Sequence, residues 1–422
     1  MAEQFNLFKD ISDSADSAVN YVGQKHPENL WMFDIQKVYW NEVYNAKKDG
    51  KKLIYMGACV PMELLYAFDC TPMLLDMLPT RLCTTPELAA KYIDIAEEHV
   101  AASMCGIDKV DLGTILSGDI PEKPDAFIYS TVPCDSSRVA YPAIDKHLGV
   151  PSFCIDIPYR KDETGYQYIA DQNKEIITFL EDLTGTKLNM DKLKEVMEIS
   201  DKTMILMKKI ADLRKNHPCP LPGALLFLNQ LIPAMAGHPE MLKCMEAQYA
   251  VAKHIVDNKM GAVKKENFRV LWLQNMLWCN LSALHYMEKT YGAIVVMEAF
   301  GYQETALFNG TTDIDEICYI SAQKALALPM IHGSSGPVED YMHLVDDAME
   351  AYDIDVAMYV GHVGCKHCWA AEKILKDMID EKYGVPMMSL DVDAVDIRYK
   401  SNDEMITVFK DFFDTLIENK KE

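Results

Sequence analysis

The feature of this sequence that most constrains its fold is the alternation of short apolar runs with longer amphipathic stretches. This alternation is typical of strand–helix–strand units that build parallel sheets. The expected strands lie at 52–57, 126–132, 152–157, 269–274, 293–298, 356–361 and 386–391. The pattern therefore predicts an α/β protein with two doubly wound parallel-sheet units of the Rossmann or flavodoxin-like type.

Two stretches lack the alternation and have helical patterns only. They are the first 50 residues and the segment 161–265, where we expect helices at 164–184, 190–213, 223–235 and 238–258. We therefore predict four parts: a helical N-terminal segment (1–50), a first α/β domain (51–160), a helical segment (161–265) and a second α/β domain (266–422).

The two α/β domains contain an internal repeat. The first copy reads DAFIYSTVPC from Asp125 to Cys134, and the second reads DVAMYVGHVGC from Asp355 to Cys365. In both copies a helical stretch follows, and then Gly-Val-Pro and a strand with an Asp five residues beyond the Pro. Each copy places a Cys just past the carboxyl end of a strand, where open α/β sheets bind their ligands.

Composition limits the partners and sets the expected state of the cysteines. Lys and Arg number 41 against 64 Asp and Glu, and the net charge of −23 argues against nucleic acid or anionic membranes as partners. No apolar run approaches the length of a membrane span, and the N-terminus is acidic, so we expect a cytoplasmic protein. The 12 cysteines are then expected to be reduced thiols, available as metal ligands or as core residues.

Three of the cysteines are candidate metal ligands. Cys134 and Cys365 occupy equivalent positions of the repeat, and Cys105 follows an amphipathic helix expected at 86–104. The start of a helix favours thiolate over thiol, and thiolate is the form that binds iron or zinc. Core packing is the competing interpretation, and it is the simpler one for Cys154, Cys244 and Cys318. Five further cysteines stay unassigned: Cys59, Cys70, Cys83, Cys219 and Cys279.

Cys365 and Cys368 form a C-x-x-C motif that fits three kinds of site. These are half of a zinc site, a redox dithiol, and part of an iron–sulfur ligand set. No second C-x-x-C is present to complete a zinc ribbon, and the motif lies far from the first expected strand. Spacing alone leaves all three open. The sequence contains no dinucleotide-binding, Walker, zincin or nucleophile-elbow motif.

The order and spacing of these motifs resemble the 2-hydroxyacyl-CoA dehydratases and the related benzoyl-CoA reductases. The resemblance runs from about residue 50 to the C-terminus. It is carried by Val60-Pro61-Met62-Glu63-Leu64, Cys105, Cys134-Asp135, Ile157-Pro158-Tyr159, Gly364-Cys365-Lys366 and the closing LDVDAVDIRY. It implies that Cys105, Cys134 and Cys365 hold a [4Fe-4S] cluster with one iron left open to substrate.

The resemblance also implies an activity and its partners. An ATP-dependent iron–sulfur activator would supply one electron, which the cluster passes to the thioester carbonyl of an (R)-2-hydroxyacyl-CoA. The ketyl radical would lose the 2-hydroxyl and then a β-proton, a syn elimination of water that gives the (E)-2-enoyl-CoA and returns the electron. The radical is needed because the β-hydrogen is too weakly acidic for a side-chain base. A homologous subunit would complete a heterodimer.

Two departures from this pattern keep other functions open. Cys368 or Cys59 would close the open iron if either supplied a fourth ligand, and the subunit would then be a non-catalytic electron relay. A benzoyl-CoA reductase-like subunit, which leaves the electrons in its product, is the enzymatic alternative. Glu63 is the candidate catalytic residue, and its competing interpretation is an acid in the first turn of a helix. The acyl group and the choice between a homo- and a hetero-oligomer stay open at this point.

Overall fold

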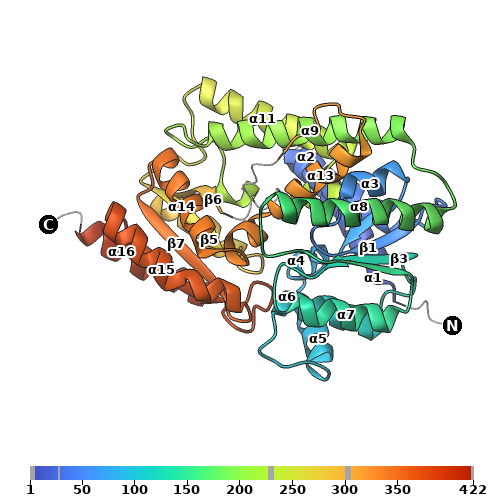
Figure 1. Ribbon diagram of the computed structural model, residues 1–422. Coiled ribbons are helices and arrows are strands. Elements are labelled where there is room, and N and C mark those ends of the chain that lie inside the picture. The colour runs from blue at the N-terminus through green and yellow to red at the C-terminus, as the bar shows by residue number, and fades with distance from the viewer. Residues whose placement is uncertain (1–4, 27–28, 227–231, 300–305, 420–422) are drawn as a thin grey trace.

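The computed structural model describes residues 5–26, 29–226, 232–299 and 306–419. Two four-stranded parallel sheets form its framework (Figure 1). The first has the order β2-β1-β3-β4 and consists of β1 (Leu53–Met56), β2 (Thr71–Leu74), β3 (Ala126–Ser130) and β4 (Ser152–Ile155). The second has the order β6-β5-β7-β8 and consists of β5 (Phe268–Gln274), β6 (Ala293–Glu298), β7 (Val356–His362) and β8 (Met387–Val392). The predicted α/β class with two parallel-sheet units is confirmed.

Strand β2 is absent from the sequence-based expectation. Its short run, Thr71–Leu74, contains Pro72, which lacks the N–H that a central strand needs. The structure places β2 at the edge of its sheet, where proline is tolerated. The missing N–H of Pro72 therefore explains both why the sequence did not predict this strand and why the strand lies at the edge of the sheet.

The internal repeat extends to the topology of the two sheets, because both have the same strand order. The amide of Leu53 donates to Oδ2 of Asp125 at 3.0 Å, and the amide of Arg269 donates to Oδ2 of Asp355 at 2.8 Å. The two aspartates that open the repeat therefore anchor equivalent strand pairs, β1 with β3 and β5 with β7. Each of these pairs forms the topological switch point of its sheet.

The helices around the first sheet share one hydrophobic core with it, which includes Trp40, Tyr55 and Phe127. These helices are α1 (Leu7–Lys25), α2 (Leu30–Asn45), α3 (Met62–Ala67), α4 (Met77–Leu82), α5 (Pro86–Glu97), α6 (Gly106–Ser117) and α7 (Ser137–Leu148). The N-terminal segment is helical as predicted. The helix expected at 86–104 ends at Glu97, and turns at 98–104 lead into Cys105.

The middle of the chain is helical as expected, with one difference. Its helices are α8 (Glu163–Thr184), α9 (Met190–Leu213), α10 (Ile232–Met235) and α11 (Pro239–Asp257). The helix expected at 223–235 is reduced to α10 and a single 3₁₀ turn at 223–226 after Pro222, and residues 227–231 lie outside the described part. Helix α13 (Ile314–Leu326) comes from the β6–β7 connection, yet it packs on α8 and joins the core of the first sheet.

The second sheet is covered by the remaining helices, with α14 and α15 packed on one face and α12 and α16 on the other. These elements are α12 (Leu281–Tyr291), the π-helical turn η3 (Met330–Ser334), α14 (Val338–Tyr352), α15 (Lys366–Tyr383) and α16 (Asn402–Asn419). No helix in the described ranges combines the length and the apolar character that crossing a membrane requires.

Candidate functional site

The three candidate cysteines lie on loops at helix starts. Cys105 is the N-cap residue of α6, and Cys365 is the N-cap residue of α15. Cys134 follows β3 and stands just before α7, whose N-cap is Ser136. Cys134 and Cys365 therefore lie beyond the carboxyl ends of β3 and β7, the central strands of equivalent switch points.

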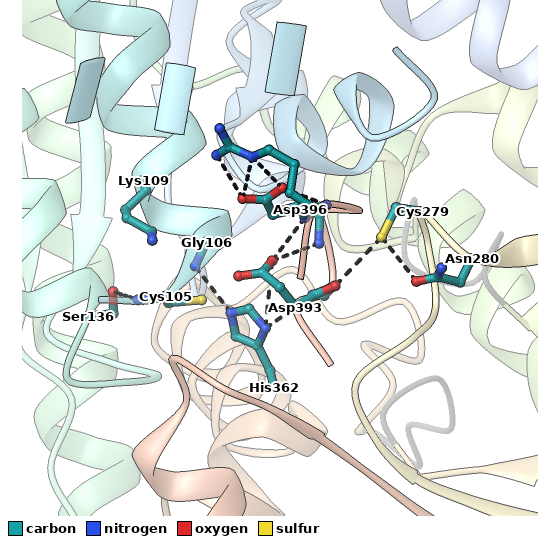
Figure 2. Close-up of polar contacts among 12 residues, drawn as sticks. Cys105, Gly106, Lys109, Ser136, Cys279, Asn280, His362, Asp393 and Asp396 are labelled. Carbon is teal, nitrogen blue, oxygen red and sulfur yellow. Dashed lines mark hydrogen bonds and ion pairs between the residues drawn. The ribbon is translucent and has the colours of Figure 1, made fainter. Parts of the chain in front are cut away.

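The loop that carries Cys105 contacts the other sheet unit directly. Figure 2 shows His362, at the end of β7, beside Gly106 at the start of α6. The amide of Gly106 donates to Nε2 of His362 at 3.1 Å, and the amide of Cys105 donates to the hydroxyl of Ser136 at 3.2 Å. One short segment is thus tied both to the loop of Cys134 and to the end of β7.

The loop that carries Cys365 and the first turn of α15 make two further contacts with the first unit. A Cβ added to Gly364 would lie 2.6 Å from Cα of Cys105, so the two backbones are packed as closely as they can be. Nε2 of His367 lies 3.2 Å from Oδ1 of Asp135, the neighbour of Cys134. The structure therefore brings together the three segments that carry the predicted ligands.

Burial and hydrogen bonds give the three thiols different acidities. Burial, Asp108 and the other two thiols raise the pKa of Cys105 well above its usual value, and burial raises the pKa of Cys134 to about 12. Hydrogen bonds from the side chain and the amide of Cys368 act against burial at Cys365 and lower its pKa to about 7. Each thiol would become a thiolate when it coordinates a cation.

Cys368 occupies the position that a serine has in the other repeat. Its amide donates to Sγ of Cys365 at 3.4 Å, as the amide of Ser137 donates to Sγ of Cys134 at 3.5 Å. The thiol of Cys368 is fully buried and faces the carbonyl of Val360 at 3.9 Å. This placement supports a hydrogen-bonding role for Cys368 beside Cys365.

The ligand set does not match a site for a single metal ion. In the described ranges, no three Cys, His, Asp or Glu side chains gather closely enough to hold one ion. Cysteines that bind different irons of one cluster need not meet at a single point, because each contacts its own iron. Three soft thiol donors on converging loops fit a cluster of this kind.

A cavity of about 240 Å³ adjoins Cys105 and Cys134. Its walls come from residues 57–59 beyond β1, from Met276 beyond β5, and from Met207 on α9 and Lys324 on α13. The cavity thus lies at the switch point of the first sheet, where doubly wound folds bind ligands. Both sheets and the helical segment contribute to it.

Glu63 lies in this cavity as a paired carboxylate. It forms an ion pair with Lys324, and the hydroxyl of Ser200 donates to its Oε1 at 2.6 Å. Burial raises the pKa of Glu63, but Lys324 and the hydrogen bonds outweigh burial and hold the pKa below its usual value. Glu63 is therefore ionised at neutral pH, and its predicted catalytic role stays a prediction.

Two further acids line the same cavity. Burial raises the pKa of Asp76 to about 6, and the hydroxyl of Tyr141 lies 3.4 Å from its Oδ1. Burial together with Asp76 raises the pKa of Asp108 to about 7, and Asp108 is 4.0 Å from Sγ of Cys134. Carboxyl groups of this kind hold protons close to neutral pH.

The sequence missed several residues of this site. No sequence motif pointed to Lys324, because it is a single Lys on a helix and is 261 residues from its partner Glu63 along the chain. Seven methionines line the cavity, and none of them forms a local motif in the sequence. The expectation that Cys154 is buried was wrong, because β4 lies at a sheet edge and leaves this side chain exposed. Cys244 and Cys318 are buried as expected.

Comparison with known proteins supports the resemblance. The family model of the 2-hydroxyglutaryl-CoA dehydratase D-component matches residues 58–416. The chain is 23% identical over 330 residues to the lactoyl-CoA dehydratase subunit alpha of Anaerotignum propionicum, covering 75% of this chain and 74% of the relative. It is 24% identical over 345 residues to the (R)-phenyllactyl-CoA dehydratase alpha subunit of Clostridium sporogenes, covering 77% and 81%. It is 19% identical over 401 residues to a benzoyl-CoA reductase subunit of Thauera aromatica, covering 89% and 91%.

Proposed function

The chain belongs to the 2-hydroxyglutaryl-CoA dehydratase D-component family, and from that premise we propose that it is the [4Fe-4S] subunit of an (R)-2-hydroxyacyl-CoA dehydratase. The observation that carries this proposal is the convergence of the three cysteine loops beside a cavity at a switch point. Two of the relatives are alpha subunits of dehydratases. We include in the proposal a homologous partner subunit and an ATP-dependent activator that supplies the electron.

Cys105, Cys134 and Cys365 would hold the cluster. Their loops are fixed by contacts across the two units, and two of the three sulfurs accept a backbone amide at the start of a helix. Such amides stabilise the negative charge of a bound thiolate. When bound, the cluster would supply one-electron chemistry and a Lewis-acidic iron.

The chain's own side chains would prepare the substrate. The apolar wall excludes water from the acyl group, which strengthens polar contacts inside the cavity. The Glu63 carboxylate, held in place by its ion pair with Lys324, offers an acceptor to the 2-hydroxyl of the substrate. Asp76, whose pKa is raised to about 6, is able to hold or release a proton at its carboxyl group.

The test is a turnover assay on protein purified without oxygen together with its partner subunit. With an activator, ATP and a 2-hydroxyacyl-CoA, we expect (E)-2-enoyl-CoA in large excess over the electrons supplied, because each electron is returned. Protein that holds iron but forms no enoyl product would contradict the proposal.

A benzoyl-CoA reductase-like activity is the second candidate, and the match over 89% of the chain to one subunit of such an enzyme favours it. The two activities differ in electron balance. A reductase would consume electrons in proportion to a reduced product, whereas a dehydratase would not.

Replacing Cys368 by Ser should leave the iron content unchanged. A hydroxyl takes this place in the other repeat, where Ser137 stands beside Cys134. An electron relay closed by Cys368 would lose its cluster in the same variant. Iron per chain and the EPR spectrum measure the difference, and Cys154→Ser, a change at an exposed thiol, serves as the control.

A further inference from the structure

We propose that the acyl group bound in this cavity carries an uncharged, apolar side chain, and that 2-hydroxyacyl-CoA thioesters with a second carboxylate are rejected. This inference rests on the proposed function and narrows its substrate class. Three properties of the cavity support it: the nature of its wall, the pairing of its charges, and its size.

The wall of the cavity is mostly apolar. Its seven methionines include Met77, Met204 and Met207, and aliphatic residues such as Leu74 and Ile331 also line it. Methionine is unbranched and polarizable, so a wall of this kind adapts to apolar groups of different shape. A hydrocarbon side chain would gain from leaving water here.

The charges of the cavity leave no partner for a second carboxylate. Among the described lining residues, Lys324 is the one Lys, Arg or His, and Glu63 already neutralises it in a buried pair. The other ionisable side chains of the wall are thiols and two further acids, Asp76 and Asp108, together with the Tyr141 hydroxyl. A substrate carboxylate would therefore be desolvated without compensation.

The size of the cavity suits a side chain of moderate bulk. Its volume is about 240 Å³, and a protein cavity of about 150 Å³ is already large enough to bind benzene. A branched aliphatic or a phenyl side chain therefore fits, while the nucleotide of CoA must lie outside. Because Cys105 and Cys134 line the same space, the bound acyl group would lie beside the candidate ligands.

The experiment is a binding measurement on the anaerobically purified protein with its partner subunit. The probes are 2-hydroxy-4-methylpentanoyl-CoA, 2-hydroxy-3-phenylpropanoyl-CoA, 2-hydroxyglutaryl-CoA and free CoA, titrated by calorimetry. We expect the first two to bind at least about a hundredfold more tightly than 2-hydroxyglutaryl-CoA. Equal or tighter binding of 2-hydroxyglutaryl-CoA overturns the substrate class and leaves the proposed function standing. If no thioester binds more tightly than CoA itself, the proposed function fails as well.

A variant tests the charge argument separately. Glu63→Gln removes the partner of Lys324, so a cation becomes available to the second carboxylate. The ratio of the Kd of 2-hydroxyglutaryl-CoA to the Kd of the neutral thioesters should therefore fall by roughly tenfold. The matched control is Glu63→Gln combined with Lys324→Met, which offers no cation and should show no gain. A folded Glu63→Gln protein with an unchanged preference would refute the role assigned to Lys324.

Discussion

Gly364→Ala is expected to lose most of the bound iron while the chain stays folded. The added Cβ would lie 2.6 Å from Cα and 2.8 Å from N of Cys105, and 2.8 Å from the carbonyl oxygen of Met104. These are backbone atoms, so no side-chain rotation relieves the contact. The loop of Cys365 must move away from Cys105, and a ligand set spread over three loops depends on that spacing. Iron per chain, measured with circular dichroism on the same sample, checks the prediction.

The control for this variant is Gly23→Ala in helix α1. The Cβ there would meet only Cδ1 of Leu30, at 3.7 Å, which is ordinary contact. Alanine also favours a helix over glycine. We expect full iron content in this protein. Full iron content in Gly364→Ala would show that the approach of the two loops does not position the ligands.

Lys324→Met is expected to destabilise the protein by ~3–5 kcal/mol at neutral pH, because it leaves the buried Glu63 carboxylate without its cation. Only 4% of the surface of Glu63 is exposed, so water cannot replace the lysine. Chemical denaturation measures the loss. Lys373→Met removes the same charge from an exposed pair with Asp377 and should leave the stability unchanged. A loss of similar size in both variants would contradict the argument.

The same pair predicts the sign of a pH effect. In the wild-type protein Lys324 and the hydrogen bonds outweigh burial and lower the pKa of Glu63. The ionised Glu63 therefore contributes its full stabilisation above pH 4.5, the ordinary pKa of a glutamate, and this stabilisation is lost at lower pH. In Lys324→Met burial acts on Glu63 without the opposing cation and raises the pKa, so protonation relieves the cost of the buried charge as the pH falls. The stability gap between the two proteins should therefore shrink from pH 7 toward pH 5. A gap that is constant over this range would show that Glu63 is not its source.

The features that sequence predicted are those with a local signal. The repeat around Cys134 and Cys365 is visible because strand, loop and helix start are contiguous in each copy, and the structure gives both copies the same topology. Both wrong predictions about strands concern strands at the edge of the first sheet. Pro72 hid the edge strand β2, and the apolar run of β4 suggested that Cys154 is buried.

The features that sequence missed depend on contacts between distant segments. The pairing of Glu63 with Lys324 arises because α13 leaves the β6–β7 connection and packs against the first unit. Neither residue carries a local pattern that points to the other. The methionines of the cavity likewise come from strands and helices of several parts of the chain, so only their high overall number was visible.

The most direct test of this account is the iron and acid-labile sulfide content of anaerobically purified protein, compared with Cys105→Ser, Cys134→Ser and Cys365→Ser. Cys154→Ser and the buried Cys244→Ser are the controls for an exposed and a core thiol. We predict about four irons per chain in the wild-type protein and in both controls, with loss of iron in each of the three ligand variants. A folded wild-type protein without iron, or ligand variants that keep it, would contradict the assignment of these cysteines to a [4Fe-4S] cluster.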